Sequence, residues 1–231
     1  MISSLFLFTA VLGALTAPTA AKSTIEWKGI PNEASLASNN TLSLNHALAS
    51  LSPGTVLNIP NETYWLSGGV FASGMVDVTI ELDGTFRFSS GREGWPTEDC
   101  TKNGEKKQCV KKAMLIENTK GLTLTTSNGG WGTVDGNGES WWGYINYLRF
   151  GEDRPKLLTI QNATDILVER WHFRQSAYHT FHADDVARLE IRHCSVENRV
   201  NEEDSHGEAA SESSCLVLVY TMCWVLFYTI C

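Results

Sequence analysis

The feature that most constrains the fold of this 231-residue chain is a series of short apolar runs separated by turn residues. Gly, Asn and Asp, which tolerate tight turns and the left-handed backbone region, stand between the runs. No run reaches the length of a typical helix, so the pattern predicts an all-β chain. The runs are Val56–Ile59, Val76–Leu82, Thr85–Phe88, Ala113–Ile116, Leu122–Thr125, Lys156–Ile160, Ile166–Val168 and Leu189–Ile191.

Three of these segments share an internal register. Asn118, Asn162 and Asp185 each precede an apolar residue by four positions. Asn162 and Asp185 are 23 residues apart, which suits one coil of a solenoid, and Asn118 and Asn162 are 44 apart, which suits one coil with an inserted loop. The spacing therefore predicts that the three residues occupy equivalent turn positions in successive coils.

A β-sandwich is the alternative to a solenoid for this pattern. Hairpins in a sandwich would show two-residue Asn-Gly or Asp-Gly turns between strands of similar length, and Asp83-Gly84 is the one clear candidate. Stacked parallel coils instead repeat each apolar position into a continuous interior ladder. We therefore expect a parallel coil, with a short amphipathic helix over Leu42–Leu51 capping its first turn, because Leu44, Leu48 and Leu51 share one face.

Both ends of the chain differ from the middle. Residues 1–21 combine an apolar stretch with a run of small residues, a signal-peptide pattern without the usual basic start; a retained membrane anchor is the alternative. Residues 22–200 form the predicted solenoid. Residues 201–231 end in seventeen residues without a charge, Cys215–Cys231, for which a membrane helix, a lipid-anchor signal and non-native sequence from readthrough or a frameshift all remain open.

Other features agree with a secreted, extracellular protein. Asn39, Asn61 and Asn162 begin glycosylation sequons. Cys100 and Cys109 flank a polar loop, Thr101 to Gln108, and an oxidising compartment would favour a disulfide between them. A zinc site is the weaker alternative because neither a CxxC pair nor a nearby histidine pair accompanies these cysteines.

The charge balance limits the partners. A formal charge of −8 argues against nucleic-acid binding, which needs clustered Lys and Arg to displace counterions. The basic run of Lys106, Lys107, Lys111 and Lys112 is interpreted as a solvated loop rather than a binding patch.

Three segments resemble one enzyme family. Gly132–Trp142, GTVDGNGESWW, resembles the G-x-[IV]-D-G-x-G-x-x-W-W signature of polygalacturonases, family 28 of the glycoside hydrolases, and Arg154–Leu158 resembles the R-P element that follows it. His172–His182 resembles the F-x-N-S-P-x-W-x-x-H stretch, with Gln175, Ala177 and His179 replacing Asn, Pro and Trp. Ser52–Pro60 is similar to the first turn of pectin-lyase-like β-helices.

The resemblance implies a right-handed single-stranded parallel β-helix that hydrolyses the polygalacturonan of pectin with inversion, as a monomer without metal or cofactor. In the family, catalytic aspartates lie in Asn-Thr-Asp and Asp-Asp motifs of later coils, assisted by Gly-His-Gly and Arg-x-Lys motifs. None of these motifs stands at its place in this sequence. We therefore expect N-terminal coils only, without catalytic residues and without activity.

Tempting residues also have structural interpretations. Asp184-Asp185 is assigned to a turn rather than to catalysis, and Asp135 to capping its own turn. Gly132, Gly136 and Gly138 fit a tight loop, and Trp141 and Trp142 fit an apolar cover of the coil edge, with sugar stacking as the alternative. Cys194 fits a small buried side chain. The histidines follow strand spacing rather than a metal-binding pattern; they are His172, His179, His182 and His193.

Two other functions remain open. One is a pectate lyase acting by β-elimination with Ca²⁺, against which the Trp141-Trp142 pair argues. The other is a non-catalytic, carbohydrate-binding β-helix, which the missing aspartates would suit.

Overall fold

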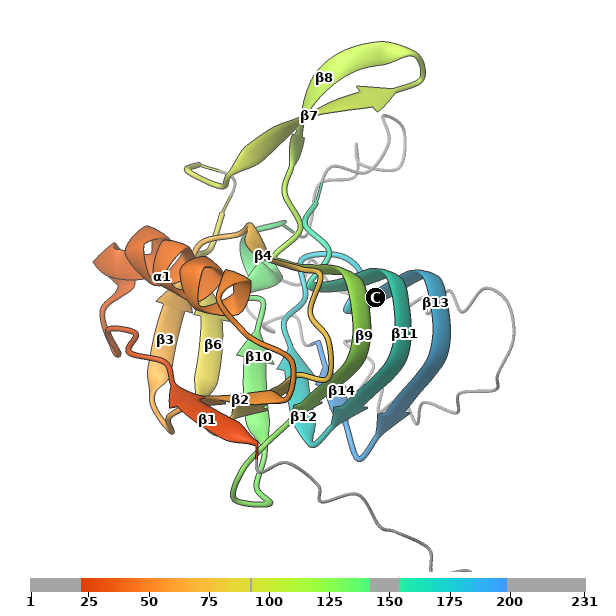
Figure 1. Cartoon of the computed structure of the whole chain (residues 1–231). Coiled ribbons are helices and arrows are strands. Elements are labelled where there is room, and N and C mark those ends of the chain that lie inside the picture. The colour runs from red at the N-terminus through yellow and green to blue at the C-terminus, as the bar shows by residue number, and fades with distance from the viewer. Residues whose placement is uncertain (1–21, 92, 142–153, 199–231) are drawn as a thin grey trace, which may run out of the picture.

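A computed structural model describes residues 22–91, 93–141 and 154–198, and in this part the chain winds into a right-handed parallel β-helix (Figure 1). Two parallel sheets form its walls. Sheet A consists of β1 (Ser23–Glu26), β2 (Thr55–Ile59), β4 (Val70–Ser73), β5 (Thr79–Leu82), β9 (Met114–Thr125), β11 (Leu158–Glu169) and β13 (Phe181–Arg192). Sheet B consists of β3 (Thr63–Leu66), β6 (Thr85–Phe88), β10 (Gly132–Asp135), β12 (Trp171–Arg174) and β14 (Ser195–Glu197).

The apolar runs stack in register, as the sequence predicts. Ile160 of β11 pairs with Ile116 of β9 and with Ala183 of β13, and all three side chains lie toward the interior or at its margin. Each added coil therefore extends one continuous core instead of starting a new one. The largest fully buried side chains are Trp141, Trp171, Phe86, Phe88, Phe173, Leu44, Leu57, Ile59, Leu66, Leu82, Leu122 and Leu124.

The turn register is also confirmed. Asn118, Asn162 and Asp185 lie one above another, with φ angles of 53°, 46° and 51°. This left-handed region is accessible to Asn and Asp at lower cost than to most residues, which explains the residue types at these positions. A second left-handed ladder follows a few residues later and contains Gly54, Asp77, Gly121, Asp165 and Arg188.

The capping helix is longer toward its N-terminus than predicted. Helix α1 spans Ala37–Ala49, preceded by a 3-10 turn at Ala34–Leu36, whereas the leucine spacing predicts Leu42–Leu51. The first turns escaped prediction because they bury polar residues: Asn40 donates to the backbone oxygens of Ile30 and Trp65. Leu44 and Leu48 cover the first coil as expected.

The prediction of a polar loop between the two cysteines is wrong. It forms an antiparallel hairpin of β7 (Thr97–Lys102) and β8 (Glu105–Val110), which rises from the body in Figure 1. Asn103 and Gly104, both at positive φ, make its two-residue turn. A disulfide joins Cys100 and Cys109, whose Cα atoms are 5.9 Å apart. Asp83-Gly84, the hairpin candidate from sequence, instead links β5 to β6 in the other sheet.

The predicted signal peptide at 1–21 and the apolar tail at 201–231 lie outside the described residues. Within the described residues, no helix combines the length and apolar character needed to cross a bilayer.

Candidate functional site

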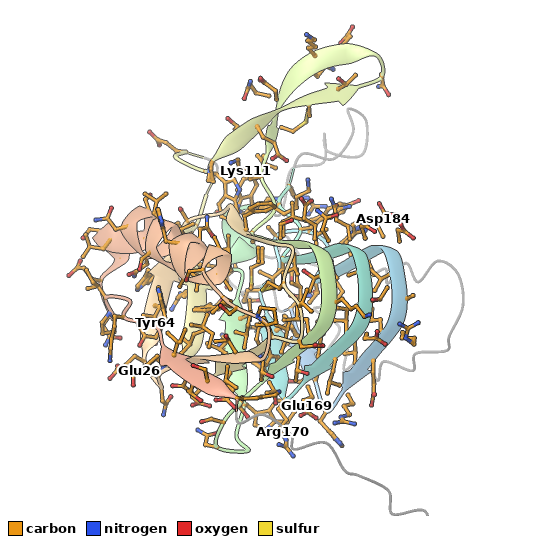
Figure 2. The ribbon with its side chains drawn as sticks, in the orientation of Figure 1. Glu26, Tyr64, Lys111, Glu169, Arg170 and Asp184 are labelled. Atoms are coloured by element: carbon orange, nitrogen blue, oxygen red, sulfur yellow. A yellow bond between two sulfur atoms is a disulfide. The ribbon has the colours of Figure 1, made fainter. Side chains whose placement is uncertain are left out.

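The long insertions of the coil gather on one edge of the β-helix. This edge, where sheet B strands end and sheet A strands begin, receives the described residues 89–91, 93–113, 136–141, 154–157 and 175–180; we call it the loop edge. Connections at the opposite edge are short, such as Asp83-Gly84 and the single residue Arg170. Figure 2 shows Lys111 and Asp184 at the loop edge and Glu169 and Arg170 at the opposite one. In repeat folds, insertions concentrated on one face commonly form the binding surface.

The turn after β10 is built by small residues and one carboxylate. The Asp135 side chain accepts a hydrogen bond from the backbone N–H of Asn137 at 2.9 Å, so the predicted capping role is confirmed. A Cβ atom on Gly138 would lie 2.5 Å from the backbone nitrogen of Ala177 in the next coil. The glycine is therefore required by close backbone packing, and it brings the turns of successive coils together.

Trp141 is a structural residue of this edge. It closes the 3-10 turn Gly138–Trp141, is fully buried, and meets Trp95 edge to face with 5.5 Å between ring centroids. The predicted cover of the coil edge is confirmed for Trp141, which has no exposed ring face for a sugar. Trp142 lies outside the described residues.

The outer face of sheet B carries a charged row that sequence reasoning missed. Asp135 is nearly buried between Arg87 and Arg174, with Nε atoms 3.7 and 3.8 Å from Oδ2. The Arg87 guanidinium also lies 4.9 Å from the centre of the Trp65 ring. The row depends on parallel register, because these residues come from four different strands.

A second row, of basic side chains, begins sheet A at the loop edge. Lys112, Lys156 and His179 occupy equivalent places in successive coils: the Ala113 amide bonds to the Lys156 oxygen, and the Leu157 amide to the His179 oxygen, both at 2.9 Å. The prediction that Lys111 and Lys112 belong to a solvated loop therefore holds only in part. Both are partly buried against the body, whereas Lys106 and Lys107 are exposed on the hairpin.

Burial and neighbouring positive charges shift the pKa values of two groups near this row. Burial, and secondarily the Lys112 charge, lower the pKa of Lys156, while Asp184 acts in the opposite direction. Burial, followed by the Lys156 charge, likewise lowers the pKa of His182. Burial and the neighbouring positive charges therefore both disfavour the charged forms of Lys156 and His182.

Aromatic groups accompany these basic side chains. The Tyr178 ring stacks on His179 with 3.7 Å between centroids, and the Arg154 guanidinium lies 4.8 Å from the Tyr178 ring centre. Side chains of this kind can pair with carboxylates and cover the apolar faces of sugar rings. In the sequence, Arg154 and His179 stand out only as parts of a motif, because their distance from Lys112 along the chain gives no sign that they lie at the same edge.

The other residues singled out from sequence are dispersed. Asp185 occupies the turn ladder, which confirms its turn role, and Asp184 lies outside it near Lys156. His172 contacts the Ser195 hydroxyl, and His193 sits at a left-handed turn. The described residues contain no group of three or more His, Cys, Asp and Glu side chains suited to a metal ion.

The cysteine and the sequons have distinct surroundings. Cys194 packs partly buried against the core, and this burial raises the pKa of its thiol. Asn39 on α1 and Asn61 between β2 and β3 are exposed. Asn162 is exposed too, but its amide nitrogen donates to the Asn118 side-chain oxygen at 2.6 Å.

Known proteins are similar to this chain in sequence and in fold. A probable endo-xylogalacturonan hydrolase A from two strains of Aspergillus fumigatus is 30% identical over 131 residues, which are 54% of this chain and 28% of that protein. The crystal structure of endo-xylogalacturonan hydrolase from Aspergillus tubingensis matches with a TM-score of 0.59 and 17% identity, covering 80% of this chain and 45% of its own.

A hyperthermoactive exopolygalacturonase from Thermotoga maritima is a further structural match, with a TM-score of 0.51 and 13% identity over 80% of this chain and 49% of its own. This chain thus spans about half or less of the length of these three relatives. The model of the family described as Glycosyl hydrolases family 28 matches residues 54–225, which is more than half of the sequence. The chain therefore belongs to glycosyl hydrolases family 28.

Proposed function

We propose that this protein acts on pectin as a polygalacturonase-type glycosidase, and that its loop edge binds the acidic galacturonan backbone. The observation that carries the proposal is the row of Lys112, Lys156 and His179 at one edge of a chain whose formal charge is −8. Galacturonan presents a carboxylate on each sugar, so a repeated row of basic side chains that can pair with carboxylates matches a repeated row of anions.

The spacing of the row supports an extended ligand. Parallel strands of neighbouring coils lie about 4.8 Å apart, so equivalent side chains recur at a distance comparable to a sugar ring. Tyr178 and His179 add aromatic surface at the same edge. A polysaccharide running along the stack could therefore meet a cationic or aromatic group at each coil.

Hydrolysis itself needs an acid and a base carboxyl on opposite sides of the scissile bond. The printed sequence lacks an Asn-Thr-Asp or Gly-His-Gly motif, and its Asp184-Asp185 pair includes a turn residue, Asp185. We therefore propose that residues 22–200 are substrate-binding N-terminal coils, and we expect residues 22–231 by themselves to bind galacturonan without cleaving it.

Xylogalacturonan is the second candidate substrate. The curated relatives from A. fumigatus and the structure from A. tubingensis both carry the name endo-xylogalacturonan hydrolase. Xylose substituents would leave the backbone carboxylates in place, so the same row of basic side chains would serve either polymer.

Affinity electrophoresis tests the binding proposal directly. Residues 22–231 are run through gels that contain polygalacturonate, xylogalacturonan, fully methyl-esterified pectin or neutral galactan. We expect retardation by the two acidic polymers only; equal retardation by neutral galactan, or none by either acidic polymer, would count against the proposal. The xylogalacturonan and polygalacturonate lanes separate the two substrates by the degree of retardation.

A product assay separates the reaction classes. Hydrolysis releases reducing ends, whereas β-elimination also produces the ultraviolet absorbance of an unsaturated uronide. We expect neither signal from residues 22–231, and the absorbance would favour the lyase alternative. Binding without either signal also fits a non-catalytic carbohydrate-binding protein. Sequencing of the spliced message would distinguish the two: an Asn-Thr-Asp-Gly segment after Glu203 favours the hydrolase, and its absence favours the binding protein.

Export is part of the same proposal. We infer that residues 1–21 are removed as a signal peptide and that the mature protein is extracellular, in keeping with the sequons and the disulfide between Cys100 and Cys109. N-terminal sequencing of protein collected from the medium of expressing cells would then begin at or near Lys22.

A further inference from the structure

A groove of about 250 Å³ lies at the base of the β7–β8 hairpin. We call it the hairpin groove. Its floor comes from β4 and β9, with the Phe71 side chain 44% exposed. Its wall comes from the hairpin base, with one carboxylate and two ammonium groups. The lining residues are Gly69, Val70, Phe71, Glu98, Lys111, Lys112 and Leu115.

The floor of the groove is held in place by helix α1. The Asn45 side chain accepts a hydrogen bond from the Phe71 amide at 2.8 Å and donates one to the Gly69 oxygen at 3.0 Å. These bonds fix the backbone on both sides of Val70, whose side chain is buried in the core. The Phe71 side chain is therefore directed outward by its alternate position on the strand, not by loose packing.

The wall is anchored as firmly. The Trp95 indole nitrogen donates to the Lys111 oxygen at 2.9 Å, and the Lys111 amide donates to the Pro96 oxygen at the same distance. Trp95 is buried against Trp141. Because the hairpin base is tied to the core, the cationic wall stands at a fixed position over the floor, as a preformed binding site requires.

Within this groove Glu98 and Lys112 form an ion pair, with 3.2 Å between Oε1 and Nζ. Both side chains are only partly exposed. Lys111 contributes a second positive charge, and its aliphatic stem packs close to Gly69. Lys112 thus already binds a carboxylate beside the exposed ring of Phe71. A uronate sugar would offer a carboxylate to the same ammonium group and an apolar face to the same ring.

We propose that the hairpin groove binds one galacturonate residue of the acidic polysaccharide. The apolar face of the pyranose lies on Phe71, and its carboxylate replaces Glu98 as the partner of Lys112. The volume is slightly below the roughly 300–1,000 Å³ of pockets for drug-sized ligands, which suits a single sugar residue. This inference rests on the proposed galacturonan-binding function and locates one sugar of that ligand at the N-terminal coils.

Calorimetric titration of residues 22–231 with trigalacturonate tests the groove. Lys112→Met should weaken binding about tenfold, because the charge-assisted pair with the carboxylate is lost. Lys106→Met, which removes the same charge from the exposed hairpin, is the matched control and should change binding little. Glu98→Gln should tighten binding about two- to fivefold, since it removes the competing carboxylate.

The aromatic contact has its own pair of variants. Phe71→Ala should weaken binding several-fold, whereas Trp131→Ala, which removes a 53% exposed ring from a turn at the opposite edge, should not. Replacement of trigalacturonate by its fully methyl-esterified form should abolish the difference between wild type and Lys112→Met. Far-ultraviolet circular dichroism of each variant establishes that it is folded.

Two results would overturn the groove. One is equal affinity of Lys112→Met and Lys106→Met for trigalacturonate with no gain in Glu98→Gln, because the loss of affinity would then follow from net charge alone. The other is no binding of trigalacturonate by the wild type. Polygalacturonate retardation that persists alongside either result leaves the proposed function standing without this groove. Trigalacturonate binding that depends on Lys112, without polygalacturonate retardation, would keep the groove and reject the proposed function.

Discussion

Asn162 lies one coil beyond Asn118, and its side-chain amide donates a 2.6 Å hydrogen bond to the Asn118 side-chain oxygen. Asn118 in turn donates to the Ser73 hydroxyl at 3.1 Å. The same two asparagines hold left-handed backbone conformations. The ladder therefore combines two roles, since each residue permits the turn and also joins its coil to the neighbouring one.

Asn118→Ala should destabilise the fold by about 2–3 kcal/mol, from a left-handed alanine and the lost hydrogen bonds. Asn118→Gly keeps the turn but loses the bonds, so its destabilisation should be smaller. Urea unfolding at constant pH measures both. Equal values for the two variants would show that the backbone conformation contributes nothing.

Gly138→Ala should destabilise by about 1–3 kcal/mol, because its methyl group would meet the backbone of Ala177. Gly130→Ala is the control, since the nearest atom to its added methyl group is the side-chain oxygen of Asn128, which can move. Thermal melting of the two proteins makes the comparison. A larger loss for Gly130→Ala would contradict the close packing of successive turns.

Acid should weaken the fold through two partly buried histidines, His172 and His182. Burial lowers the pKa values of His172 and His182 below the ordinary 6.5, so below pH 6.5 the unfolded chain takes up protons that the folded chain refuses. Stability is therefore present above that pH and is lost as the pH falls toward the folded-state pKa values. Unfolding in urea at pH 7.5 and 5.5 should show a smaller loss for His182→Gln than for wild type; an equal loss would exclude a contribution from His182.

Cys100→Ser with Cys109→Ser should loosen the hairpin more than the body. The disulfide closes a short loop, with a sequence separation of 9, for which the loop-closure entropy corresponds to about 2–3 kcal/mol. The hairpin tip is exposed, so trypsin should cut after Lys106 or Lys107 much faster in the double variant. Cleavage within β9 or β11 at the same rate would show instead that the body depends on this bond.

Glycan occupancy should differ among the three sequons. Asn39 and Asn61 are exposed, whereas the glycan-accepting nitrogen of Asn162 is the atom that bonds to Asn118. In folded protein secreted from a eukaryotic host, we expect glycans at Asn39 and Asn61 and an unmodified Asn162. Mass spectrometry of peptides released with and without glycosidase would detect the opposite pattern.

The strand pattern was largely predictable because it depends on local residue types. Val, Ile and Leu runs and the recurring Asn or Asp were enough to predict a parallel coil and to align Asn118, Asn162 and Asp185. Asn103-Gly104 was also a local signal for the hairpin, but the polar residues around it favoured a loop interpretation. The early turns of α1 were missed because Asn40 is buried through bonds to distant backbone atoms.

Residue types alone predicted the stacked turn positions and most of the apolar residues that face the core, since both follow from the conformational preferences and polarity of single residues. Which charged side chains meet became apparent only in the folded chain. Lys112 and Lys156 are 44 positions apart, and Phe71 and Lys112 are 41 apart, yet the coils and the hairpin bring both pairs to one edge. Insertion lengths between strands set that alignment, and these lengths carry no periodic signal, so the groove becomes visible only when the coils are stacked.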